Sequence, residues 1–197
     1  QEFQQFEFAS LIASGAGAAA MNMPILCNGA NLAFRREVWL KNMDRLHFEV
    51  PGGDDIFLLQ SVKKRKGIIR FLKSREVTVT TQTSGNLKSF INQRRRWASK
   101  KSAYADWQLA LTAVVIFMAS FIILFNLFMA VLHPQYLLLA GILFLLKLLI
   151  DTSMFRVVGE FFGLKRVAVN AFLFSLIYPF YIVFTAIISL FNPKKGW

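Results

Sequence analysis

An uncharged apolar run dominates the second half of the chain and limits what that half can become. Residues 109–132, LALTAVVIFMASFIILFNLFMAVL, contain no Asp, Glu, Lys or Arg. A helix needs roughly 20 such residues to cross the hydrocarbon core of a bilayer. Within that core only a structure that pairs its own backbone polar groups is stable. We therefore expect a membrane-spanning helix over residues 109–132.

Two further apolar runs, residues 136–151 and 167–191, predict two more membrane-spanning helices. Lys147 and Asp151 interrupt the first of them, and their four-residue spacing allows an ion pair on one face of the helix. Pro179 predicts a kink or a break in the second. We therefore expect about three membrane-spanning helices, one of which carries an internal ion pair.

The first 108 residues have a different character. The whole chain is 55% hydrophobic with a net charge of +12, yet most of its 23 Lys and Arg residues precede residue 109. Basic residues beside membrane helices are typical of the cytoplasmic side and of contact with anionic lipids. No nucleic-acid-binding motif accompanies the charge, so we expect no nucleic-acid partner. We predict a cytoplasmic domain over residues 1–108 and a membrane domain over residues 109–197.

The first 108 residues predict both helices and strands. Apolar residues recur at helical spacing over residues 3–20, and the sequence VPGGDD is typical of a loop followed by a helix start. Short apolar or alternating runs at residues 24–27, 68–72 and 76–81 predict strands. Further helices are expected to begin near residues 36 and 86. This pattern indicates an α/β domain.

The stretch INQRRRW, directly before the membrane part, has two interpretations. Gln93, Arg96 and Trp97 share one face of a helix, while Arg94 and Arg95 are expected to face lipid headgroups or solvent. A guanidinium binds phosphate oxygens in pairs, an aromatic ring covers the C–H face of a sugar, and an amide binds hydroxyls. This face therefore suits a sugar phosphate. Alternatively, the arginines and the tryptophan anchor the chain at the membrane surface.

The aspartate pair in GGDD also has two interpretations. Asp54 and Asp55 suit the first turn of a helix, where the dipole stabilises acidic side chains by about 0.3–1 kcal/mol. The same position places a carboxylate at the mouth of a glycine loop, where it could take a proton from a hydroxyl. Cys27, the single cysteine, excludes an internal disulfide, and we expect it to act as a small buried apolar residue.

Taken together, these motifs resemble the C-terminal half of the membrane-integrated family 2 glycosyltransferases, which include the cellulose and hyaluronan synthases. QRRRW matches the Q-x-x-R-W motif of that family at every defined position, and GDD at residues 53–55 resembles its T-E-D motif. The segment CNGANLAFRREVW resembles the acceptor-side segment that precedes T-E-D. The resemblance covers about residues 1–108.

The resemblance implies part of a GT-A type α/β domain followed by membrane helices. It implies a membrane-bound inverting glycosyltransferase that moves a sugar from a nucleotide-sugar to a glycan or lipid acceptor. Asp55 would be the catalytic base, and Asp54 stands where the family has Glu. The implied substrate-binding residues are Asp54, Gln93, Arg96, Trp97, Asn28 and Gly29.

The donor-binding half of the family and its D-x-D metal motif have no counterpart in this chain. We therefore expect a fragment of a longer protein, in which a divalent Mg or Mn ion binds outside these residues. As a fragment alone it is expected to be inactive, and the full-length protein is expected in a bacterial inner membrane. The alternative is a non-catalytic membrane anchor or scaffold whose basic domain binds lipid headgroups.

Overall fold

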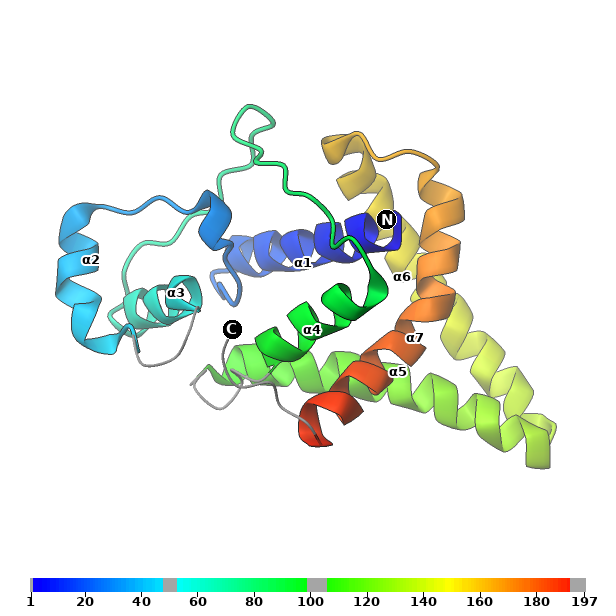
Figure 1. Ribbon diagram of the computed structural model, residues 1–197. Helices are drawn as coiled ribbons and strands as arrows, with labels where there is room; N and C mark the ends of the chain where they lie inside the picture. The colour runs from blue at the N-terminus through cyan, green and yellow to red at the C-terminus, as the bar shows by residue number, and fades with distance from the viewer. Residues whose placement is uncertain (1, 48–52, 99–105, 192–197) are drawn as a thin grey trace. The chain divides into compact units, whose positions relative to one another are not determined.

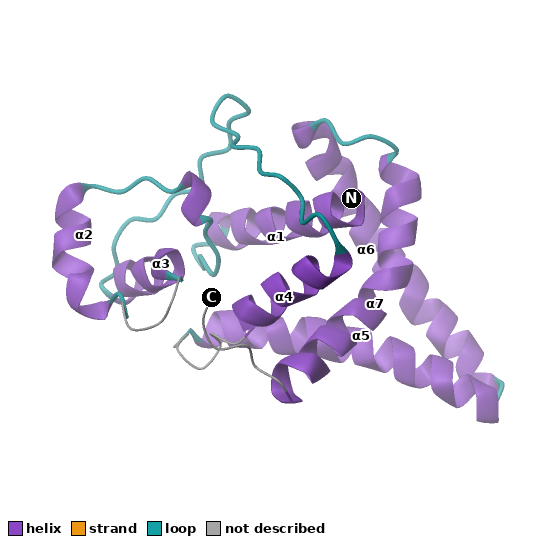
Figure 2. Cartoon of the chain, viewed as in Figure 1, coloured by secondary structure: helices purple, strands orange, loops and turns teal. Residues whose placement is uncertain are grey.

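The computed structural model describes residues 2–47, 53–98 and 106–191, which form helices joined by loops (Figure 1, Figure 2). Short 3₁₀ turns, η1 (Gly29–Asn31) and η2 (Met43–Arg45), flank the second helix. The α-helices in these ranges are α1 (Glu2–Ala20), α2 (Arg36–Asn42), α3 (Asp54–Lys64), α4 (Leu87–Ala98), α5 (Trp107–Leu132), α6 (Gln135–Phe162) and α7 (Val167–Phe191).

The expected α/β domain of GT-A type is wrong for this chain, because the described residues contain no β-strand (Figure 2). Segments 24–27, 68–72 and 76–81, which the sequence predicts as strands, lie in loops. A strand is stable only when a neighbouring strand pairs with its backbone groups, and none of the described segments does so here. The Val77 carbonyl instead accepts a hydrogen bond from the Asn31 side chain at 2.8 Å.

The described residues group into two compact units. We call residues 2–10 with 111–191 the membrane unit, and residues 11–47 with 53–98 and 106–110 the polar unit. Both boundaries between the units fall inside a helix, one in α1 and one in α5. The first turns of α1 therefore group with the apolar helices.

Helices α5, α6 and α7 are each long and apolar enough to cross a membrane, which confirms the prediction of three such helices. α6, however, runs to Phe162, beyond the expected end at residue 151. Asp151 does not end the helix because its charge is paired: Lys147 forms the expected ion pair with it, and the Ser175 hydroxyl donates a 2.6 Å hydrogen bond to it. Gly163, with a φ of 65°, ends α6 in a left-handed conformation.

Phenylalanines form the core of the membrane unit. The side chains of Phe6, Phe155 and Phe174 are each at most 3% exposed. The ring centroid of Phe155 lies 4.9 Å from those of Phe6 and Phe174, in edge-on arrangements that stabilise aromatic pairs. Buried Glu7 accepts a hydrogen bond from the Tyr181 hydroxyl at 3.1 Å. These contacts pack the first turns of α1 against α6 and α7.

α7 contains a proline within its length. The helix continues through Pro179 without interruption, and its axis changes direction along its course (Figure 1). Proline removes a backbone N–H and crowds the preceding turn, which is the usual cause of a sharp kink. Of the two outcomes that the sequence predicts here, the helix is kinked and not broken.

A small apolar core holds α3 in the polar unit. Leu46, Phe57 and Leu58 are buried together, and side chains of α2 pack against them. Next to this core, the Ser61 hydroxyl donates a 2.6 Å hydrogen bond to the Asn42 side chain. α3 is therefore fixed along one side, which sets the position of the aspartate pair in its first turn.

Candidate active site

α3 begins at the aspartate pair, as the sequence predicts. Gly53 occupies the N-cap with φ 90° and ψ 4°, a left-handed conformation that glycine adopts without strain. Its carbonyl accepts the N–H of Phe57 at 2.9 Å. Asp54 and Asp55 thus lie where the helix dipole favours negative charge. Asp54 is exposed and Asp55 is half-buried.

The Asp55 carboxylate contacts the Asn28-Gly29 turn. Its Oδ2 accepts the N–H of Gly29 at 2.9 Å, and its Oδ1 accepts the N–H of Ile56 at 2.8 Å. Each carboxylate oxygen thus has its own backbone donor, and the two hydrogen bonds orient the carboxylate at the start of α3. The structure therefore brings together three of the predicted site residues, Asn28, Gly29 and Asp55.

Glycine at position 29 allows this close approach. The Asn28 side chain accepts the N–H of Ala30 at 3.1 Å and so closes the turn. A Cβ atom at position 29 would lie only 3.1 Å from Oδ2 of Asp55, which is tight enough to displace the carboxylate. The Asn-Gly pair thus forms the expected turn and also shapes the contact with Asp55.

Cys27 lies directly beside this site. Its thiol donates a 3.2 Å hydrogen bond to the backbone carbonyl of Asp55. Burial, followed by the negative charges of Asp55 and Asp54, raises the pKa of the Cys27 thiol from 9.0 to about 12. The half-buried side chain is therefore a protonated, weakly polar group beside α3, less buried than the apolar residue that the sequence predicts.

We expect Cys27 to resist alkylation at neutral pH. Iodoacetamide reacts with the thiolate, and a pKa raised from 9.0 to about 12 lowers the thiolate fraction at pH 8 by about 10³-fold. The rate in the folded protein should therefore keep rising up to about pH 12, while that of the denatured chain levels off above about pH 9. Mass spectrometry over a pH series measures both rates. A folded protein labelled at pH 8 as fast as the denatured chain would contradict this assignment.

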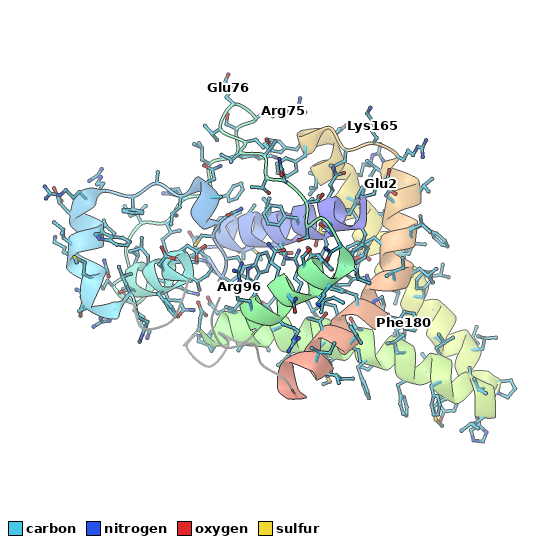
Figure 3. All side chains as sticks on the ribbon, viewed as in Figure 1. Glu2, Arg75, Glu76, Arg96, Lys165 and Phe180 are labelled. Atoms are coloured by element: carbon cyan, nitrogen blue, oxygen red, sulfur yellow. The ribbon has the colours of Figure 1, made fainter. Side chains whose placement is uncertain are left out.

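The second group of predicted site residues lies on α4. The Asn86 side chain accepts the N–H of Ser89 at 2.8 Å and caps the helix, close to the predicted start. Gln93, Arg96 and Trp97 all lie on this helix. Arg96, labelled in Figure 3, is half-buried, and the Trp97 side chain is 36% exposed.

The arginine that contacts Gln93 and Trp97 is Arg94. Its guanidinium donates a 2.9 Å hydrogen bond to Gln93 Oε1, and it lies 4.2 Å from the Trp97 ring centroid and 4.6 Å from that of Phe90. Arg94 is 7% exposed, so the expectation that it faces headgroups or solvent is wrong. Phe90, Arg94 and Trp97 recur at helical spacing, a signal that the sequence contains and that motif matching overlooks.

The two groups of residues remain separate. Among the described residues, no hydrogen bond or ion pair joins α4 to Asp54 or Asp55. Gln93 and Trp97 are instead held by Arg94, within one helix. The described contacts therefore do not join the QRRRW motif directly to the two carboxylates.

A divalent metal does not fit the residues around Asp55. The described ranges contain no group of three His, Cys, Asp or Glu side chains that could hold an ion. Both oxygens of Asp55 already accept backbone N–H groups, whereas Mg²⁺ requires several oxygen ligands in near-octahedral geometry. The chemistry of this group of residues is therefore that of a positioned carboxylate.

Comparisons of this chain with protein-family models, curated proteins and solved structures found no match. A function for the chain must therefore follow from its motif residues and their contacts.

Proposed function

We propose that this chain is part of a membrane-bound inverting glycosyltransferase that transfers a sugar from a nucleotide-sugar to a hydroxyl of a glycan or lipid. The observation that carries the proposal is the contact between Asp55 and Gly29, 26 residues apart in the sequence. These residues come from the two segments that resemble the catalytic and acceptor-side motifs of the family 2 enzymes. Their contact places the proposed base, Asp55, directly beside the proposed acceptor-side segment at Gly29.

In the proposed reaction, Asp55 takes the proton of the acceptor hydroxyl. The acceptor oxygen attacks the anomeric carbon from the side opposite the nucleotide diphosphate. A new C–O bond forms while the bond to the diphosphate breaks with its electron pair, so the configuration inverts. A general base must lie within hydrogen-bond distance of the proton that it takes and keep a defined orientation. The N–H groups of Gly29 and Ile56 supply that orientation.

Residues of α4 bind the substrates in this proposal. Arg96 binds diphosphate oxygens, because a planar guanidinium offers two parallel hydrogen bonds. Gln93 binds a hydroxyl, Trp97 covers a sugar ring, and Asp54 of α3 contacts the acceptor. Arg94 is a positioning residue, since its contacts orient both Gln93 and Trp97.

We assign the polar unit to the cytoplasmic side of the membrane. Most basic residues of the chain precede α5, and positive charge next to a membrane-spanning helix favours the cytoplasmic face. The apolar faces of α5, α6 and α7 are compatible with direct lipid contact. Donor and acceptor would therefore meet at the cytoplasmic surface of the membrane.

A non-catalytic membrane anchor or scaffold is the second candidate. The loop after α3 supports it, since the exposed basic residues Arg65, Lys66 and Arg70 are interspersed with exposed Ile68 and Leu72. Basic and apolar side chains in alternation suit the headgroup region of an anionic bilayer. In such a protein, membrane binding would depend on the positive charge of these side chains and not on the geometry of their hydrogen bonds.

Arg96→Lys distinguishes the two candidates, because lysine keeps the charge and loses the planar fork. The enzyme proposal predicts that transfer of labelled sugar by the full-length protein falls roughly 10–100-fold, from the loss of charge-assisted hydrogen bonds. Arg95→Lys, the same change on the adjacent residue, is the matched control and should keep normal activity. Equal activity of Arg96→Lys and wild type, with membrane association unchanged, would favour the anchor.

A further inference from the structure

Lys63 makes two polar contacts at the far end of α3. Its ammonium donates a 2.6 Å hydrogen bond to Oδ2 of Asp106 and a 3.0 Å hydrogen bond to the carbonyl of Pro24. The Lys63 side chain is 24% exposed and that of Asp106 is 6% exposed. An ion pair this short and this sheltered from water is much less screened than one on the surface.

Asp106 also caps the first turn of α5. Its Oδ1 accepts the N–H groups of Gln108 at 2.9 Å and Leu109 at 3.4 Å, so this side chain caps the start of α5. One carboxylate therefore closes the first membrane-spanning helix with one oxygen and binds Lys63 with the other. Through Asp106, α3 is tied to the first turn of α5.

The contact with Pro24 links Lys63 to the candidate active site. Pro24 begins the segment that continues through Cys27 to Gly29, and the Gly29 N–H binds Asp55 at 2.9 Å. The Cys27 thiol binds the Asp55 carbonyl along the same segment. This segment therefore lies along α3 with a polar contact near each end, from Lys63 at one end and Asp55 at the other.

We infer that Lys63 is a positioning residue for Asp55: together with Asp106 it fixes segment 24–29 against α3 and joins that arrangement to the start of the first membrane-spanning helix. The inference rests on the proposed function for its effect on catalysis, whereas the structural link can be tested without any transfer assay. Removal of the ammonium releases Pro24 and leaves the Asp106 charge with its cap hydrogen bonds alone. Segment 24–29 is then held less firmly against α3, and the Gly29 hydrogen bond that orients Asp55 is weakened.

The test is the alkylation rate of Cys27 in the full-length protein in membranes, at a fixed pH of 10. Lys63→Met keeps most of the apolar stem and removes the charge, and it should raise the rate at least ~10-fold through local opening of the segment. Lys63→Arg, which can still reach both acceptors, should restore protection. Lys64→Met, on the exposed neighbour, is the matched control and should react like wild type.

Asp106→Asn provides a second variant if Lys63→Met does not fold, because Asn preserves the cap of α5 while removing the charge. Asp106→Asn, like Lys63→Met, is expected to raise the alkylation rate of Cys27. Equal Cys27 rates in wild type, Lys63→Met and Asp106→Asn would overturn the inference. Loss of helical circular dichroism in both variants would also overturn it, since the ion pair would then maintain the whole unit and not one segment.

The effect of Lys63 on catalysis is tested by measuring sugar transfer. If Lys63 positions Asp55, Lys63→Met should lower kcat roughly 10–100-fold, as expected for a misplaced catalytic group, with KM for the nucleotide-sugar unchanged. A change in KM alone would overturn the positioning role. If wild type itself transfers no sugar, the proposed function fails, while the Cys27 rates still decide whether the link exists.

Discussion

Asp55→Asn should reduce sugar transfer by the full-length protein about 10²–10⁴-fold, the usual loss when a general base is removed. The amide cannot take a proton from the acceptor hydroxyl, although it is nearly the same size and shape as the carboxylate. The loss should appear in kcat at saturating donor and acceptor. Initial rates with labelled nucleotide-sugar, measured on equal amounts of membrane-inserted protein, give the value.

The same variant has a structural effect that must be separated from catalysis. The two carboxylate oxygens each accept a backbone N–H, from Gly29 and Ile56, and an amide offers only one oxygen. A displaced turn should therefore be checked through the alkylation rate of Cys27. Asp44→Asn removes an exposed carboxylate of the same unit and serves as the matched control with normal activity. Near-normal transfer by Asp55→Asn would rule out its role as the base.

The second large effect is expected inside the membrane unit. Lys147→Met should destabilise the folded protein by about 3–5 kcal/mol, because it leaves the Asp151 carboxylate buried without its cation. The two side chains are only 16% and 14% exposed, so water can replace little of the lost interaction. The Ser175 hydrogen bond to Asp151 remains, yet a hydroxyl does not neutralise a charge. Unfolding in mixed detergent micelles with increasing SDS measures the free energy of unfolding.

The double variant Lys147→Met/Asp151→Leu tests the cause of that effect. Replacing both members of a buried ion pair with apolar residues is often neutral or stabilising, so most of the lost stability should return. Lys165→Met, which changes an exposed lysine of the same unit, is the matched single control and should unfold like wild type. A double variant less stable than Lys147→Met would show that the pair itself, and not the uncompensated charge, provides the stability.

Local signals in the sequence predicted the helices well. α3 starts at the Gly-Asp-Asp turn, where Gly53 is the N-cap. α4 starts at Asn86, whose side chain accepts the N–H of Ser89. Both signals lie within one helical turn of the start that they predict. The three helices that are long and apolar enough to cross a membrane follow from composition over a long window, which depends little on the rest of the chain. The turn at Asn28-Gly29 is equally local.

Features that depend on distant partners were predicted wrongly or missed. The alternating run at residues 76–81 has the pattern of a strand, but a pattern cannot supply a second strand. α6 continues past Asp151, whose carboxylate pairs with Lys147 and accepts a hydrogen bond from Ser175 of α7. Arg94 is a different case: the motif face of Gln93, Arg96 and Trp97 leaves it out, but Phe90 and Trp97 of the same helix enclose it. For the run at residues 76–81 and for the end of α6, the deciding contact comes from a segment that the local sequence does not identify.

The proline in α7 has a mechanical consequence. Pro179 has no N–H to donate to the carbonyl of Ser175, four residues earlier, so the helix lacks one lengthwise link at that turn. The Ser175 side chain instead reaches sideways to Asp151 of α6 at 2.6 Å. The turn at Pro179 is therefore easier to bend than the rest of α7, and at the same level a side-chain hydrogen bond joins α7 to α6. We therefore expect a change in the tilt of the end of α7 to occur by bending at this turn, next to the hydrogen bond that joins it to α6.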